Sequence, residues 1–221
     1  MSDVEKKQQA IRIDFFKELR KLLETLSWSE DLISIAESNI GLDTGYNYII
    51  FPSGLQQIVA AFEKWLDKQM LEQLSVLDKP KKIRDQIALA LEIRILGVMS
   101  KKVALRCCGY YLIPTNIVAG TEAACHSCDI IWKYAGDKSS DYNYYTKRGL
   151  LLGVYGAARA FYLGDNSADH KDTKAFIKNA LDNIINIASF KHNIKMPKME
   201  DIPIIRLFLK RKNYKYQIYD Q

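Results

Sequence analysis

The feature that most constrains the fold is the spacing of apolar residues, which recur every three or four positions along most of the chain. In residues 5–26 they are Ile11, Phe15, Leu19, Leu22, Leu23 and Leu26. This spacing places apolar side chains on one face of an α-helix. Only five prolines and eleven glycines interrupt the 221 residues, which argues against an all-β sandwich. We therefore predict an all-α fold.

The breaks in the pattern predict a bundle of nine or ten helices. The expected helices cover residues 5–26, 29–38, 53–77, 80–100, 102–113, 115–134, 139–163, 169–190 and 202–212. Ser29 is the expected N-cap of the second helix, since Glu30 and Asp31 follow it in the first turn. Pro80 is expected in the first turn of a helix, and Gly136 as a left-handed cap. Gly41 and Gly45 break the pattern, and residues 45–54 are expected to form a connection.

The N-terminal elements have the proportions of a helix-turn-helix unit, and the whole pattern resembles TetR regulators. We expect a helix-turn-helix-like unit at 5–54, an all-helical ligand-binding and dimerisation body at 55–190, and a basic segment at 191–221. Residues 1–54 carry six Lys and Arg against nine Asp and Glu, and DTGYNYII, where a recognition helix would lie, has no cation. Because DNA binding depends on cations that neutralise phosphates, we expect this unit to be degenerate and to serve folding.

Composition excludes several other classes. A hydrophobic fraction of 48% against 26% charged residues is that of a globular protein, not a disordered one. No apolar run approaches the roughly 18 residues that a transmembrane helix needs. Four cysteines without a preceding signal peptide favour a reducing cytoplasm.

The cysteines and histidines do not predict a metal site. Cys125, His126 and Cys128 form a single CxxC pair with an adjacent histidine, whereas structural zinc needs four ligands in tetrahedral reach. We expect packing cysteines and no metal. The sequence has no phosphate-binding loop, dinucleotide fingerprint or nucleophile elbow. Neither catalytic residues nor cofactors are therefore predicted, apart from a bound lipid.

Residues 129–148, DIIWKYAGDKSSDYNYYTKR, have the composition of a protein–protein hot spot. Tyr142, Tyr144 and Tyr145 cannot all face one core from a single helix, which suggests exposed aromatics beside Arg148. The alternative is a helix whose tyrosines lie around the edge of a core. Composition alone leaves both interpretations open.

The same segment is similar to the signature of the Coq-nine family of ubiquinone-biosynthesis accessory proteins. The matching pattern is Trp132-x-x-Ala135-Gly136-Asp137-x-Ser139-x-Asp141-x-Asn143-x-Tyr145-Thr146-Lys147-Arg148, and Leu163-x-Asp165-x-Ser167 and Asp172-Thr173-x-x-Phe176 continue it. The earlier matches are Phe51-Pro52-x-Gly54 and Lys82-Ile83-Arg84. The resemblance covers about residues 11–190. Tyr144 and Ser140 depart from it, where the family often has Trp and Thr.

The resemblance implies a TetR-like, homodimeric, lipid-binding protein that supports the di-iron hydroxylase (Coq-seven) acting on demethoxyubiquinone. By family position, the surface that meets the hydroxylase consists of Asp129, Trp132, Asp137, Asn143, Tyr144, Tyr145 and Arg148. A polyprenyl tail needs a long apolar cavity between helices. Candidate lining residues are Leu89, Ile93, Leu96, Leu105, Leu112, Ile113, Ile117, Ile131, Leu150, Val154 and Phe161. The same residues would also make an ordinary helical core.

Residues 202–212 predict a basic amphipathic helix that binds an anionic membrane surface. The contact residues are Ile204, Ile205, Phe208, Leu209, Lys210, Arg211 and Lys212. The alternative is a docked terminal helix with a solvated charged side. Without a transit peptide, we expect a bacterial member, cytoplasmic and peripheral on the inner membrane; a eukaryotic member would lie on the matrix face.

Together these features predict a non-enzymatic protein that presents an isoprenoid quinone precursor to the hydroxylase. The leading alternative is a ligand-responsive TetR-like transcription regulator. A small quinone-modifying enzyme is a third hypothesis.

Overall fold

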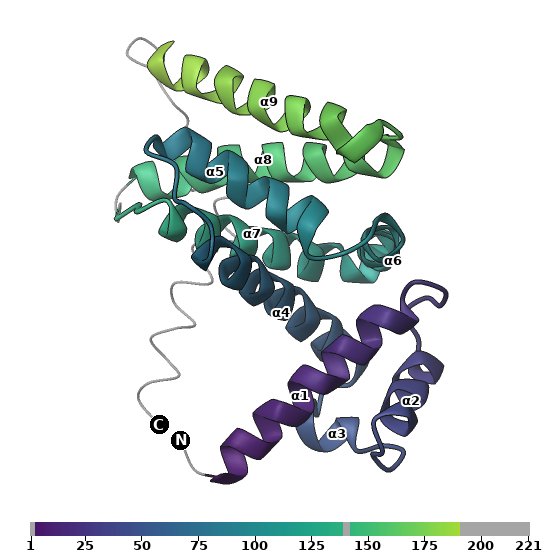
Figure 1. The fold of residues 1–221 in the computed structure, drawn as a ribbon. Coiled ribbons are helices and arrows are strands. Elements are labelled where there is room, and N and C mark those ends of the chain that lie inside the picture. The colour runs from purple at the N-terminus through teal and green to yellow at the C-terminus, as the bar shows by residue number, and fades with distance from the viewer. Residues whose placement is uncertain (1–2, 139–141, 191–221) are drawn as a thin grey trace. The chain divides into compact units, whose positions relative to one another are not determined.

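In the computed structural model, residues 3–138 and 142–190 are described, and the regular structure within them is entirely helical (Figure 1). The predicted all-α fold is confirmed. The α-helices are α1 (Asp3–Leu22), α2 (Glu30–Asn39), α3 (Asn47–Ile50), α4 (Leu55–Ser75), α5 (Ile83–Glu92), α6 (Lys101–Leu112), α7 (Ile117–Tyr134), α8 (Tyr142–Gly164) and α9 (Lys171–Phe190). A π-helical segment, η1 (Ile93–Gly97), follows α5, and the 3-10 turns η2 (Pro114–Asn116) and η3 (Ala168–His170) precede α7 and α9.

The chain divides into two compact units. Unit 1 comprises Met1–Leu77 and Ile93–Ala123, so it contains α1 to α4, η1, α6 and the start of α7. Unit 2 comprises Asp78–Glu92 and Ala124–Gln221, so it contains α5, the rest of α7, α8 and α9. Unit 1 runs across the expected division at residue 54, because α1 and α4 share one core. The expected segment 191–221 lies outside the described residues.

An aromatic cluster forms the centre of unit 1. The ring of Phe16 lies 5.9 Å from that of Trp65, 5.8 Å from that of Phe51 and 6.1 Å from that of Phe62. Trp28, between α1 and α2, meets Phe62 edge-on at 5.3 Å. Edge-on and tilted ring pairs of this kind add stabilisation beyond their buried area. The cluster therefore holds α1 against α4.

The helix boundaries agree with the expected caps at two places. Ser29 has extended backbone angles, and its side chain accepts a hydrogen bond from the Leu32 backbone N–H at 3.1 Å, which confirms it as the N-cap of α2. Gly136 has a φ of 84°, the left-handed conformation expected after α7.

Residues 45–54 are not only a connection, because the short helix α3 lies within them. The buried carboxylate of Glu37 accepts hydrogen bonds from the backbone N–H of Gly45 at 2.9 Å and from that of Asn47 at 2.5 Å. The amide of Asn47 donates to the same carboxylate at 2.8 Å. A side chain of α2 therefore satisfies the N-terminal donors of α3, and local spacing could not reveal that contact.

The predicted helix at 80–100 is also wrong in its boundaries. Helix α5 begins at Ile83, and the carbonyl of Pro80 accepts a hydrogen bond from the Gln86 amide at 2.7 Å instead of opening the helix. The regular helix ends at Glu92, where the backbone changes to the π-helical segment η1. Ser100 then caps α6 through the backbone N–H of Val103.

In unit 2, α8 packs along α9 (Figure 1). Phe161 of α8 stacks on Phe176 of α9, with ring centroids 4.8 Å apart. Asp165 joins the two helices at their turn, because its carboxylate accepts hydrogen bonds from the backbone N–H groups of Ser167 and Thr173 at 2.8 and 3.0 Å. The Thr173 hydroxyl donates to the same carboxylate at 2.5 Å.

Candidate functional site

A buried ion cluster joins the end of α7 to the first turns of α8 in unit 2. The guanidinium of Arg148 donates from Nε to Oδ1 of Asp129 at 2.8 Å and from Nη1 to Oδ2 of Asp137 at 3.0 Å. The Arg148 side chain is 1% exposed, and those of Asp129 and Asp137 are 12% and 4% exposed. One arginine therefore binds two carboxylates that lie on either side of the Gly136 turn.

Charged neighbours extend the cluster to the surface. Lys147 Nζ lies 2.8 Å from Asp137 Oδ1, and Lys133 Nζ lies 2.7 Å from Asp129 Oδ2. Burial raises the pKa of Asp129, but hydrogen bonds from Lys133 and Arg148 lower it more, so that this pKa lies below its ordinary value. Asp129 is therefore an ionised partner of two cations and not a proton donor at neutral pH.

Two aromatic side chains are fixed at the edge of this cluster. The Tyr144 hydroxyl donates to Asp129 Oδ1 at 3.0 Å, and its ring lies 3.4 Å from the Arg148 guanidinium carbon. The indole N–H of Trp132 donates to the backbone carbonyl of Lys147 at 3.1 Å. Both aromatic residues are half-buried. They therefore present part of each ring at the surface in a fixed orientation.

The structure brings together five of the residues predicted to bind the hydroxylase: Asp129, Trp132, Asp137, Tyr144 and Arg148. Tyr145 meets Tyr144 edge-on at 5.0 Å but is only 5% exposed. Of the two interpretations left open, that of exposed aromatics does not hold for Tyr145, which is buried. Arg148, beside these tyrosines, is buried as well, because it binds the two aspartates. Asn143 belongs to α8, and its side chain lies outside the described residues.

The candidate lipid-lining residues are divided between the two units. In unit 1, Ile93 is buried, and Leu96 lines a cavity of about 430 Å³ with Arg20, Val98 and Met99. The other candidates of this unit are exposed: Leu105, Leu112, Ile113 and Ile117. In unit 2, Ile131 and Val154 are buried, Leu89 and Leu150 are half-buried, and Phe161 is partly covered by Phe176.

The membrane-contact residues expected at 204–212 lie outside the described residues. No helix in the described ranges is long and apolar enough to cross a bilayer. Cys107, Cys125 and Cys128 are buried in helical cores. Among residues 3–138 and 142–190, no three His, Cys, Asp or Glu side chains gather in a way that suits a metal ion.

One buried charge cluster was not predicted. Arg94 of η1 is fully buried; it donates from Nε to Oδ1 of Asp67 at 2.7 Å and forms an ion pair with Glu63. The available signal was the position of these acids in residues 55–77. Glu63 and Asp67 are four residues apart and lie beside the apolar positions Phe62 and Leu66, where an acid needs a buried cation.

Comparison with known proteins identifies the region that carries the first cluster. Residues 117–188 match the family model for COQ9. These residues contain α7, α8 and most of α9, and so include Asp129, Asp137 and Arg148.

Similarity to individual proteins extends beyond that region. The chain is 28% identical over 204 residues to the Probable ubiquinone biosynthesis protein coq9, mitochondrial, of Dictyostelium discoideum. The alignment covers 84% of this chain and 63% of the relative. It is 31% identical over 167 residues to the Ubiquinone biosynthesis protein COQ9, mitochondrial, of Xenopus tropicalis. That alignment covers 70% of this chain and 51% of the relative. The corresponding protein of Rattus norvegicus is 27% identical over 179 residues, with 76% and 56% covered.

The chain thus spans between half and two thirds of the length of these relatives. The resemblance inferred from residues 129–148 is confirmed by both comparisons, and the chain is a COQ9-family protein whose family domain comprises residues 117–188.

Proposed function

We propose that this chain is a non-enzymatic accessory protein of ubiquinone biosynthesis. It binds an isoprenoid quinone precursor and presents it to the demethoxyubiquinone di-iron hydroxylase at the membrane surface. Membership of the COQ9 family supports the pathway, because the relatives are named as ubiquinone biosynthesis proteins.

The observation that carries the proposal is the fixed aromatic surface of α7 and α8. Binding hot spots consist of a few well-anchored side chains, with tryptophan, tyrosine and arginine prominent among them. Here Trp132 and Tyr144 are anchored by hydrogen bonds to the Lys147 carbonyl and to Asp129, and Arg148 supports the Tyr144 ring from beneath. The rings are therefore ordered before a partner arrives, which lowers the entropic cost of binding. The exposed Lys133 and the half-buried Lys147 lie beside them and, although each pairs with an aspartate, suit a partner with acidic side chains.

Exposed apolar side chains at the connection from α6 to α7 support lipid binding. Leu112 is 76% exposed, and Ile113, Ile117 and Val118 each expose about half of their surface. Covering such side chains with a polyprenyl tail stabilises a complex by about 0.8 kcal/mol for each buried methylene group. We also propose a homodimer, as the resemblance to the family implies.

The membrane contact is assigned to residues 202–212 on the amphipathic pattern in the sequence. A chain truncated after Met199 is expected to lose its binding to anionic liposomes in a sedimentation assay, whereas the full chain binds. Equal sedimentation of the two chains would reject this assignment. The proposed location of the protein is therefore the surface of the membrane on which ubiquinone is synthesised.

Helix α3 does not favour the alternative hypothesis of a DNA-binding transcription regulator. The region of a recognition helix is reduced to the four residues of α3, which contain no Lys or Arg. Its exposed side chains are Tyr48 and Ile49, which cannot neutralise phosphates. We expect no sequence-specific shift of DNA by the purified protein at physiological salt.

The lipid is tested by extraction and mass spectrometry of the purified full chain. An isoprenoid quinone precursor in near-stoichiometric amount is expected. A preparation that binds the hydroxylase but carries no lipid, and takes up none when incubated with the precursor, would contradict the presenting role. Turnover of the precursor by this chain alone would contradict the non-enzymatic role.

The surface is tested by co-purification with the hydroxylase. Trp132→Ala is expected to reduce the recovered hydroxylase at least tenfold, since hot-spot tryptophans contribute about 2 kcal/mol or more. Tyr48→Ala is the matched control, an exposed aromatic residue of α3 outside the family domain, and is expected to leave recovery unchanged. Circular dichroism of both variants checks that helicity is kept. Full recovery with Trp132→Ala would remove this surface from the proposal.

A further inference from the structure

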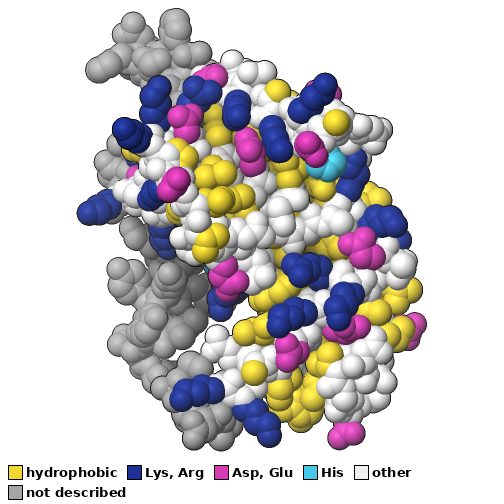
Figure 2. Space-filling view, viewed as in Figure 1, with side chains coloured by type: hydrophobic (Ala, Val, Ile, Leu, Met, Phe, Trp, Pro, Cys, Tyr) yellow, Lys and Arg dark blue, Asp and Glu magenta, His cyan; other side chains and the backbone are white. Residues whose placement is uncertain are grey.

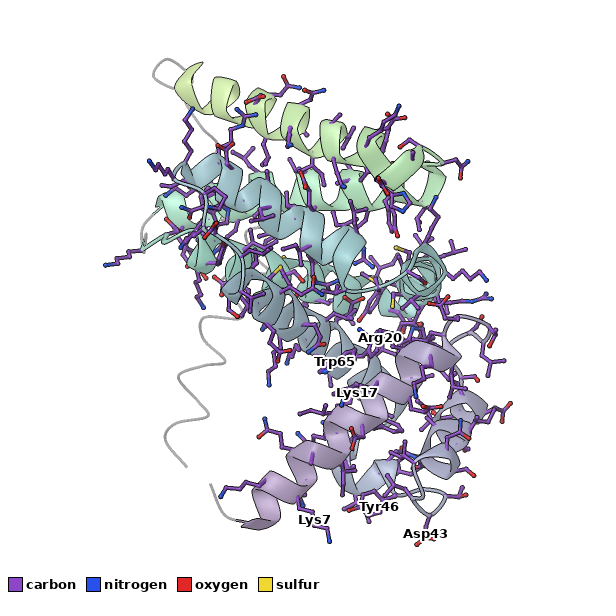
Figure 3. The ribbon with its side chains drawn as sticks, viewed as in Figure 1. Lys7, Lys17, Arg20, Asp43, Tyr46 and Trp65 are labelled. Atoms are coloured by element: carbon purple, nitrogen blue, oxygen red, sulfur yellow. The ribbon has the colours of Figure 1, made fainter. Side chains whose placement is uncertain are left out.

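A groove between α1 and α4 in unit 1 is not used by the proposed function. Figure 1 shows α1 crossing α4, with the two helices diverging on one side of the crossing. The groove has a volume of about 890 Å³, within the range of small-molecule sites. Figure 3 labels Lys17 and Arg20 of α1 and Trp65 of α4 at this crossing.

The floor of the groove is apolar and largely aromatic. It is built from Phe16, Phe51 and Trp65, whose ring centroids lie 5.8 Å (Phe16 to Phe51) and 5.9 Å (Phe16 to Trp65) apart. Ile13, which is 37% exposed, and Ala61 continue this surface. Phe16, Phe51 and Trp65 belong to the core of unit 1 and are only 6%, 2% and 5% exposed, so the floor is rigid and a small part of each residue reaches the groove. Such a floor accepts an alkyl chain and offers few hydrogen bonds.

The rim of the groove is cationic. Arg12, Lys17, Lys64 and Lys68 line it, whereas Glu72 is the acid that lines it. This is the reverse of the balance in residues 1–54, where acids outnumber bases. Figure 2 shows Lys and Arg side chains gathered over the part of the molecule where α1 meets α4.

Two of these lysines form no ion pair within the described residues, and Glu72 is the acid that shares the groove with them. Lys64 and Lys68 are exposed and lie four residues apart on one face of α4, and no acid in the described residues forms an ion pair with either. The neighbouring acids Glu63 and Asp67 are turned inward and pair with Arg94. Arg12 is held in position, since its Nη2 donates to the Ile50 carbonyl at 3.2 Å and its guanidinium lies 5.3 Å from the Phe51 ring.

We propose that this groove binds a single-chain anionic amphiphile, with its alkyl chain on the aromatic floor and its carboxylate or phosphate at Lys64 and Lys68. Charge complementarity selects the occupant: an acidic head group meets a rim with a net positive charge, and an apolar chain meets the floor. The site is separate from the proposed function, because demethoxyubiquinone, the substrate of the hydroxylase, carries no acidic head group that needs these lysines. It assigns a second, charge-selective ligand to the protein.

The proposal is tested with dodecanoate below its micelle concentration, titrated into the full chain by isothermal calorimetry. Dodecanol is the neutral ligand of equal length. Dodecanoate is expected to bind at least about fivefold more tightly than dodecanol. The variant Lys64→Gln/Lys68→Gln is expected to weaken dodecanoate binding about five- to tenfold and to leave dodecanol binding unchanged, since two exposed ion pairs contribute roughly 1 kcal/mol in total.

The charge-matched control is Lys81→Gln/Lys82→Gln, which removes two exposed lysines from unit 2. It is expected to bind dodecanoate like the wild type. An equal loss in both double variants would show a general effect of net charge and would overturn the site, as would wild-type affinity in Lys64→Gln/Lys68→Gln.

The floor is tested by Ile13→Gln, which alters a partly exposed side chain and spares the buried rings. It is expected to weaken dodecanoate and dodecanol binding alike, with an unchanged melting temperature. If neither affinity changes, the alkyl chain does not lie in this groove. Loading with the neutral quinone precursor is measured in parallel, and its failure would concern the proposed function alone.

Discussion

The guanidinium of Arg148 covers the ring of Tyr144, with its central carbon 3.4 Å from the ring centroid. Its Nε and Nη1 donate hydrogen bonds to Asp129 and Asp137 at the same time. One buried cation thus holds α7, the Gly136 turn and α8 together. The partly exposed ring of Tyr144 takes its orientation from this contact. A change at position 148 is therefore expected to alter the folded state before it alters any binding surface.

Arg148→Met is expected to lower the free energy of unfolding by about 3 kcal/mol, because two largely buried carboxylates lose their buried cation and keep only their contacts with Lys133 and Lys147. Urea denaturation measures the change. The control is Lys178→Met, which removes a 58% exposed lysine 3.9 Å from Glu92 and is expected to cost less than about 1 kcal/mol. Similar losses in the two variants would mean that the cluster adds nothing beyond a surface ion pair.

Arg94→Met is expected to be similarly destabilising, because Asp67 and Glu63 are buried beside it. Replacing all three residues, as Glu63→Met/Asp67→Leu/Arg94→Met, is expected to cost less than Arg94→Met alone, since no buried charge then remains in the cluster. Chemical denaturation of both variants decides the point. A triple variant less stable than the single one would show that the ion cluster itself stabilises η1 against α4.

The acid sensitivity of the protein is expected to depend on Asp165. Hydrogen bonds from Ser167 and Thr173 hold the pKa of the Asp165 carboxyl far below its ordinary value in the folded state. The unfolded chain therefore takes up this proton first, near pH 4, and the stabilisation is lost as the pH falls from there toward the folded-state pKa. Asp165→Asn is expected to make the unfolding free energy less dependent on pH between 5 and 3.

This pH dependence is measured by urea denaturation at several pH values, with Asp172→Asn as the charge-matched control. Asp172 is exposed in the first turn of α9, and its replacement is expected to keep the wild-type slope. A wild-type slope in Asp165→Asn would assign the acid sensitivity to other carboxylates.

Two glycines of unit 1 are expected to respond to alanine in opposite directions. A Cβ at Gly120 of α7 would lie 2.7 Å from Cγ of Tyr111, too close for any side-chain contact, so Gly120→Ala is expected to destabilise the protein by about 1–3 kcal/mol. A Cβ at Gly109 of α6 meets nothing within 4 Å, so Gly109→Ala is expected to stabilise it by about 0.5–1 kcal/mol. Thermal melting compares them. Equal melting temperatures would show that Tyr111 moves aside without cost.

The elements that were predictable are those defined by near neighbours. The apolar spacing located the long helices, and the cap at Ser29 followed from a serine before two acids. Helix α3 was missed because its donors are satisfied by Glu37, a residue of the preceding helix. The start of α5 was misplaced because Pro80 uses its carbonyl to bind Gln86, an arrangement that helix statistics do not anticipate.

The candidate site shows the same division. Residues 129–148 could be singled out by their composition and by their resemblance to COQ9 proteins. The burial of Arg148 could not be predicted from the sequence, because an arginine faces solvent or core according to which acids lie near it in the fold. Asp129 and Asp137 lie 19 and 11 residues away in sequence, and only the α7–α8 turn brings both to the same guanidinium.

The amino-acid sequence by itself determined that this chain is helical, where most of its helices run, and which family it belongs to. These properties depend on contacts within a few residues or on a pattern shared with relatives. Tertiary structure alone decided which charges are buried, which aromatic rings remain at the surface, and that cations from α1 and α4 border one apolar groove. Those outcomes depend on side chains far apart in sequence, whose free energy is set by the dielectric surroundings and partners that packing supplies.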